Sequence, residues 1–148
     1  MASPGIPAKR DHWLLAIGYG LLAEIATIVT IIAVVMLIKY ANFQRLSEAE
    51  YASIGQNVGR YIGVFGAAVY TYIFARRLIP KISSRFSEHG IVVALAAITL
   101  SIAGSIAGHQ SVPSEYMFAS LLKIIAGARA GFVHLRTVRV HSGGDARH

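Results

Sequence analysis

The chain has 148 residues, of which 55% are hydrophobic and 14% charged. Soluble domains carry about 25% charged residues, so this composition argues against a soluble globular domain. The absence of cysteine excludes disulfides and thiolate metal sites. The net charge of +7 could suit a nucleic-acid partner, but the basic residues collect in the connections between apolar segments. We therefore predict no nucleic-acid partner.

Four apolar segments approach or exceed the length needed to cross a membrane, which is about 20 residues for a helix. The spans are expected at about 13–38, 55–76, 91–108 and 115–135. Because the first apolar run is much longer than a signal-peptide core, we interpret it as a retained span. The predicted fold is all-α, an integral membrane four-helix antiparallel (up-down) bundle.

Basic residues are distributed unevenly among the connections. The 76–89 segment is the most basic, whereas the 109–115 segment contains no Lys or Arg. Since cytoplasmic loops are enriched in Lys and Arg, we expect the N- and C-termini to be cytoplasmic. An even number of spans places both termini on the same side, which agrees with this expectation. The predicted location is the cell inner (plasma) membrane, with multiple passes and the lipid bilayer as the first partner.

The chain is expected to form a single domain. Residues 1–10 are predicted to be a disordered lead, 11–139 the four-span transmembrane domain, and 140–148 a flexible basic tail.

Local signals also predict where two of the helices begin. The sequence SEAE, Ser47 to Glu50, has the spacing of a capping box, so the second helix should begin near Glu48. The third helix is expected to start after Gly90.

Small residues recur at helical spacing in three of the spans. Small residues four apart give a flat helix face that another backbone can approach closely. The helix-packing positions predicted in this way are Gly55, Gly59, Gly63, Gly104, Gly108, Gly127 and Gly131. The pattern fits either internal packing of the bundle or a seam between copies of the chain.

Charged residues inside the spans are informative because they are costly to insert. Glu24, the one charged residue of segment 13–38, and Lys123 are expected at similar depth. However, side chains tilt toward the N-terminus of their own helix, which separates Glu24 from Lys123 and brings Glu24 toward Arg129. We therefore expect a Glu24–Arg129 pair if the first and last spans touch, with Lys123 extending outward. Glu24 would then be structural, whereas an unpaired Glu24 would suit a titrating site.

Other polar residues give weaker signals. Arg60 is expected either to reach the outer headgroups or to join Gln56 and Asn57 in an outer polar cluster. Ser105 and His109 lie four apart, but no acid is evident to orient the histidine, so we predict no catalytic residues. The histidine spacing contains no H-x-x-x-H motif, and we predict neither a metal site nor a cofactor.

The stretch GLLAEI, which contains Glu24, resembles the first-helix acid motif of the small multidrug resistance transporters. The resemblance covers six residues and implies a proton- or cation-coupling role for Glu24. The later spans depart from that family, because Arg60, Lys123 and Arg129 place positive charge where a cation binder would avoid it.

The sequence as a whole predicts a small multi-pass membrane protein that is not an enzyme. Its expected role is structural, accessory or regulatory, through helix packing and contacts with lipid, with a second copy or with another membrane protein. The alternative is a proton- or cation-coupled small transporter or channel subunit that uses Glu24.

Overall fold

The computed structural model describes residues 12–41, 47–82, 84–107 and 114–144, with 135–144 described by their backbone alone. The elements are α1 (Trp13–Ala41), α2 (Glu48–Tyr61), the π-helix η1 (Ile62–Gly66), α3 (Ala67–Leu78), the 3₁₀ helix η2 (Ile79–Lys81), α4 (Phe86–Ala107) and α5 (Glu115–Gly144). All regular structure in the described residues is helical, as the sequence predicted. Residues 1–10 and 145–148 of the predicted lead and tail lie outside these residues, and α5 includes 140–144.

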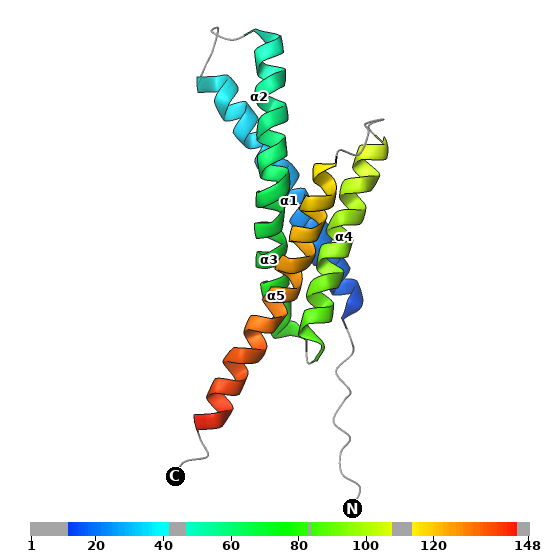
Figure 1. Ribbon diagram of the computed structural model, residues 1–148, viewed down its shortest axis with the longest axis vertical. Coiled ribbons are helices and arrows are strands. Elements are labelled where there is room, and N and C mark those ends of the chain that lie inside the picture. The colour runs from blue at the N-terminus through cyan, green and yellow to red at the C-terminus, as the bar shows by residue number, and fades with distance from the viewer. Residues whose placement is uncertain (1–11, 42–46, 83, 108–113, 145–148) are drawn as a thin grey trace, which may run out of the picture.

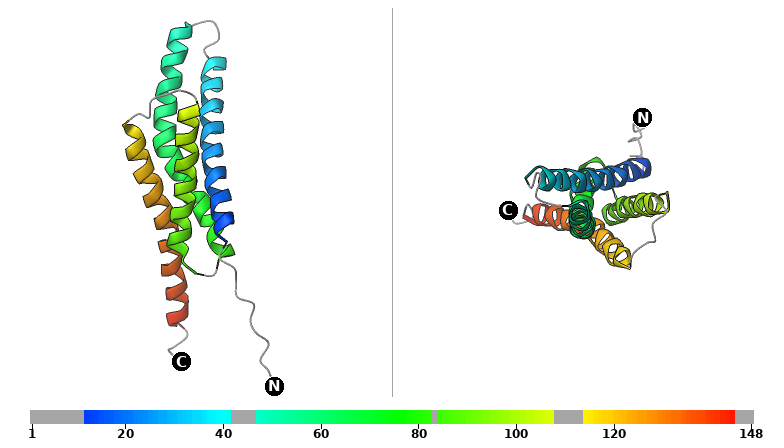
Figure 2. Two further views of the ribbon diagram at one scale, coloured as in Figure 1. Left: turned by 90° about the vertical axis from the view of Figure 1, so that its right-hand side faces the viewer. Right: turned by 90° about the horizontal axis from the view of Figure 1, so that it is seen from above.

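Four helical segments are long and apolar enough to cross a membrane. They are Trp13–Ala41, Glu48–Lys81, Phe86–Ala107 and Glu115–His134. The second of these is one continuous rod formed by α2, η1, α3 and η2. The four segments alternate in direction and pack side by side (Figures 1 and 2).

The bundle has two different ends. At one end α1 begins, η2 and α4 are joined, and α5 extends beyond the other helices (Figure 1). We call this the basic end, because it includes Arg76, Arg77, Lys81 and Arg85. At the opposite end, which we call the far end, α1 and α2 project past the tops of α4 and α5 (Figure 2).

The apolar core lies toward the basic end. Its buried members are Ala16, Ala75, Leu78, Ile79, Ile82, Val93 and Ala130. Tyr19 and Phe86 pack against this cluster from its margin. By contrast, α2 has no buried residue. Much of the outer surface of the bundle is apolar, as expected where helices face lipid.

The predicted capping box is confirmed at the start of α2. The Ser47 backbone N–H donates to the Glu50 carboxylate at 2.7 Å, and the Glu50 N–H donates to the Ser47 hydroxyl at 3.4 Å. These two bonds satisfy backbone donors that the first turn of a helix leaves without partners. The bond from the Ser47 backbone holds the pKa of Glu50 below its ordinary value, because it stabilises the charged carboxylate.

The predicted start of the third helix was wrong by about one turn. α4 begins at Phe86, directly after Arg85, which has a φ of 54°. Gly90 is therefore inside the helix rather than before it. Its backbone lies directly against Gly127 of α5, so that a Cβ at either position would collide with the carbonyl of the other. The glycine at 90 serves close helix packing and does not stop the helix.

The predicted packing glycines fall into two groups. Gly127 and Gly131 lie against the backbone of α4. In contrast, a Cβ added at Gly55, Gly59, Gly63 or Gly104 would meet nothing within 4 Å. Gly108 lies outside the described residues. Of the predicted glycines, those of α5 therefore serve internal packing, whereas the glycine row of the second span faces open space.

Candidate functional site

Three helices contribute one side chain each to a buried polar cluster, formed by Glu24 of α1, Ser101 of α4 and Lys123 of α5. The Lys123 ammonium donates to one Glu24 oxygen at 2.7 Å and to the Ser101 hydroxyl at 2.9 Å. The Ser101 hydroxyl donates to the other Glu24 oxygen. Both carboxylate oxygens are therefore bound by protein groups.

The cluster is closed to the surroundings of the bundle. The exposed fractions of Glu24, Lys123 and Ser101 are 6%, 3% and 8%. An unpaired charge at such a position would be strongly disfavoured, whereas a charge pair with further hydrogen bonds is tolerated. Two surface pockets of the described structure are lined by other residues. The geometry is that of a closed ion pair.

The predicted Glu24–Arg129 pair is wrong, because Lys123 occupies the position opposite Glu24. The reason is the rotation of the helix. Lys123 and Arg129 are six residues apart, which corresponds to roughly 240° around the helix axis. Lys123 consequently faces the interior, while Arg129 is on the exposed side of α5. Depth and side-chain tilt bring Arg129 toward Glu24, but the rotation around the helix axis outweighs both.

Lys123 also has the length needed to bridge the distance from α5 to Glu24. α1 and α5 each pack mainly on α3 and α4 rather than on one another. A long side chain is therefore needed to reach from α5 to Glu24. The four-carbon stem of lysine supplies this length and can be buried among apolar groups.

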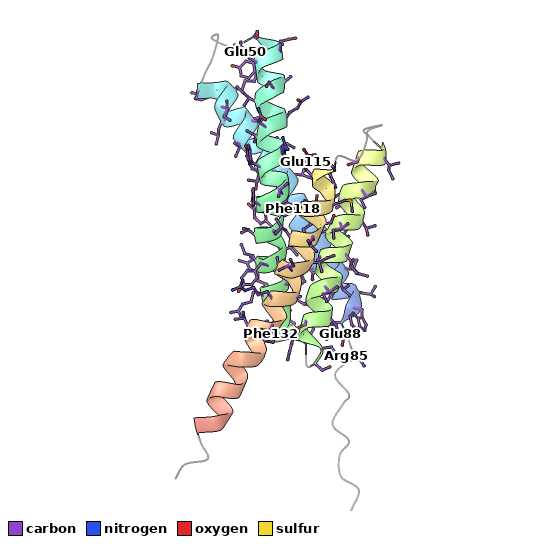
Figure 3. The ribbon with its side chains drawn as sticks, in the orientation of Figure 1. Glu50, Arg85, Glu88, Glu115, Phe118 and Phe132 are labelled. Carbon is purple, nitrogen blue, oxygen red and sulfur yellow. The ribbon has the colours of Figure 1, made fainter. Side chains whose placement is uncertain are left out.

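The predicted outer polar cluster is also not what the structure shows. Arg60 forms an ion pair with Glu115 at the start of α5, at 2.7 Å, with both side chains more than a third exposed. Gln56 and Asn57 are exposed on α2. Figure 3 shows Glu115 toward the far end of the bundle, where α5 begins. Arg60 therefore links the second span to the fourth.

Other polar contacts within the bundle were missed from the sequence. The hydroxyl groups of Thr30 and Tyr70 lie 2.7 Å apart and connect α1 with α3. Since the Thr30 hydroxyl donates to the Ala26 carbonyl, the Tyr70 hydroxyl can donate to Thr30. Ser101 had a detectable signal, because it belongs to a row of small residues that includes Ala97. Nothing in its spacing identified Glu24 as its partner.

A buried histidine near the basic end was missed as well. The ring of His89 stacks on Trp13 at 4.0 Å between centroids, with an angle of 6° between the planes. Its Nδ1 lies 3.0 Å from the Arg85 carbonyl oxygen, and its Nε2 has no hydrogen-bond partner among the described residues. This contact ties the start of α1 to the start of α4.

The chemistry available to the Glu24 cluster is limited. The Ser101 hydroxyl donates to the Glu24 carboxylate and accepts from the Lys123 ammonium, and at 8% exposure it is enclosed by the helices rather than open to a substrate. His109, the partner considered for Ser105, lies outside the described residues. No group of three or more metal-binding side chains occurs in the part of the chain that the structure describes. The cluster can fix three helices relative to one another.

The chain matches no protein-family model, and neither the curated proteins nor the solved structures give a match.

Proposed function

We propose that the chain is a multi-pass protein of the inner (plasma) membrane that acts through contacts rather than through a reaction. Its role would be structural, accessory or regulatory toward other components of the membrane, with both termini in the cytoplasm. The observation that carries this proposal is the closed Glu24–Lys123–Ser101 cluster, in which both carboxylate oxygens are occupied.

The direct partner of Glu24 supports the first of the two functions that the sequence left open, the structural, accessory or regulatory role. A coupling acid must exchange its proton or cation with a path through the membrane, and an ammonium 2.7 Å away competes with any cation for the carboxylate. A fixed pair has a different use. Because its members come from α1, α4 and α5, it favours one register of these helices over alternative packings.

The outer surface offers means of contact with other molecules. Gly55, Gly59 and Gly63 are spaced four apart and have open space in front of them. Such a row permits the backbone of another transmembrane helix to come close, whether from a second copy or from a different protein. This surface supports an accessory role, because the interior of the bundle does not use it.

The proposal can be tested by removing the charges singly and together. We expect Glu24→Gln or Lys123→Met alone to lower the free energy of unfolding by about 3 kcal/mol, because each leaves one buried charge without its partner. The double variant should lose much less than the sum, since no charge remains unpaired. Thermal unfolding of the purified protein in detergent micelles would measure these differences.

The same proteins separate the proposal from the transport alternative. Reconstituted wild-type protein should give no proton or cation flux above that of empty liposomes. A flux that is lost in Glu24→Gln and is not recovered in the double variant would contradict the proposal. The unfolding measurement shows in each case whether the variant is still folded.

A further inference from the structure

Arg129 is a positively charged residue of the fourth span that takes no part in the buried cluster of Glu24, Ser101 and Lys123. It lies on the exposed side of α5, and no ion pair joins it to another described residue. A charged side chain on the surface of a transmembrane helix is unfavourable unless it reaches water, headgroups or a counter-charge. The surroundings of Arg129 should therefore supply water, a lipid headgroup or a counter-charge.

A pocket of about 520 Å³ lies next to this arginine, between α4 and α5. Its lining residues are Ser87, Ala128, Arg129, Phe132 and Val133. The lining thus combines one cation and one hydroxyl with three apolar side chains. The two helices are held together beside it by the contact of Gly131 with the backbone of Phe86 and Ser87, which gives the pocket a fixed wall.

The polar groups of the pocket match a phosphate group. A guanidinium can donate two parallel hydrogen bonds to phosphate oxygens, and a serine hydroxyl can donate another. Ser87 also lies in the first turn of α4, where helix amides and the helix dipole favour negative charge. The acid that follows Ser87 in the sequence is Glu88. Its carboxylate oxygen lies 3.7 Å from a guanidinium nitrogen of Arg85, and both side chains are largely exposed.

The position of the pocket favours a lipid over a soluble anion. Figure 3 places Phe132 at the same end of the bundle as Arg85 and Glu88, so the pocket belongs to the basic end. Basic residues near a bilayer surface attract anionic headgroups. The apolar side chains of Ala128, Phe132 and Val133 offer a surface for the start of an acyl chain, which free phosphate lacks.

We propose that the pocket between α4 and α5 binds the phosphate headgroup of an anionic phospholipid, with Arg129 and Ser87 as its polar contacts. This inference rests on the membrane location included in the proposed function. It goes beyond that location by assigning a specific lipid class to a specific site.

The test is a titration of the full-length protein in detergent with phosphatidylglycerol, with bound lipid counted by native mass spectrometry. Arg129→Gln should weaken binding about tenfold, as expected for loss of a charge-assisted contact to phosphate. Ala128→Leu should weaken it similarly, because it fills the pocket and keeps every charge. Arg77→Gln is the matched control, since it removes an exposed positive charge at the same end but outside the pocket.

Several outcomes would overturn the inference. Equal weakening by Arg77→Gln and Arg129→Gln would indicate diffuse attraction to the basic end rather than a site. Phosphatidylcholine binding as tightly as phosphatidylglycerol would remove the preference for an anionic lipid. Competition by inorganic phosphate at concentrations comparable with the lipid would identify a soluble ligand. If Arg129→Gln does not fold, Ala128→Leu still decides the question, because full binding by that variant contradicts the pocket.

Failure of this inference can be told apart from failure of the proposed function. Membrane fractions washed with alkaline carbonate retain integral proteins. If the wild-type protein is washed off, the membrane location fails and the lipid site fails with it. If the protein is retained but shows no lipid preference, only the lipid site is lost.

Discussion

The half of the bundle near the basic end and the half near the far end are held together in different ways. Near the basic end, helix backbones touch, as at Gly90 and Gly127, and the apolar core is buried. Toward the far end, α2 has no buried residue, and its glycines face open space. The exposed Arg60–Glu115 pair joins the spans there.

The second span shows the change from one half to the other within a single helix. Its buried residues are Ala67, Thr71, Ala75 and Leu78 of α3 and Ile79 of η2. The π-helix η1 lies between α3 and the unburied α2. Short π-helical turns are often found where a helix serves a function. The difference between α2 and α3 shows that a row of small residues indicates a helix surface that another backbone can approach. Whether a helix of the same bundle occupies that surface depends on how the neighbouring helices are placed.

The largest expected effect comes from replacing a glycine by leucine in the half near the basic end, and the same replacement in the far half is its comparison. Gly90→Leu should prevent native packing or lower the free energy of unfolding by about 3 kcal/mol or more, because the Gly127 backbone occupies the space. Gly59→Leu should change it by less than about 0.5 kcal/mol, because that position is open. Thermal unfolding in micelles measures both. Equal destabilisation by the two changes would remove the distinction between the halves.

A smaller effect is expected where the two halves meet, at the Thr30–Tyr70 contact. Tyr70→Phe should lower the free energy of unfolding by about 1 kcal/mol, the usual value of one hydrogen bond, while Thr30 keeps its bond to Ala26. Tyr61→Phe is the matched control, because Tyr61 is 65% exposed. If both variants unfold like the wild type, the ordered packing that begins at the basic end does not extend as far as the Thr30–Tyr70 contact.

The all-helical fold was predictable because hydrophobicity and length alone identify helices that are able to cross a membrane. A helix in lipid must satisfy its own backbone, which limits an apolar segment of this length to few structures. The capping box was predictable for a similar reason, since its hydrogen bonds are made within four residues, Ser47 to Glu50. Such local rules need no knowledge of neighbouring helices.

The candidate site was only partly predictable, because it depends on which faces of three helices meet. The sequence identified Glu24 as unusual and predicted a basic partner, but it selected Arg129 instead of Lys123. Ser101 could not be recognised as part of the cluster before α4 was placed beside α1. Gly20 and Gly90 were not predicted as packing positions, although each lies directly against a backbone atom of another helix.

The smallest expected effect concerns the cap of α2, which lies outside the packed half. Because the folded-state pKa of Glu50 is lowered, the cap contributes stability above the unfolded pKa of about 4.3 and loses it as pH falls through the folded pKa. Acidification should therefore lower the protection factor of the Tyr51 amide, which is its intrinsic exchange rate at each pH divided by the observed rate; the Tyr51 N–H donates to the Ser47 carbonyl.

Ser47→Ala is the control for this effect, because it removes the hydroxyl that accepts from the Glu50 N–H. Exchange at Tyr51 should be faster in this variant already at neutral pH, whereas amides of the Gly90–Gly127 contact should be unaffected. A loss of protection on acidification that is equal in both regions would show that α2 and the packed half unfold as one unit. Exchange confined to the start of α2 would mean that the far end opens while the core of the bundle stays closed.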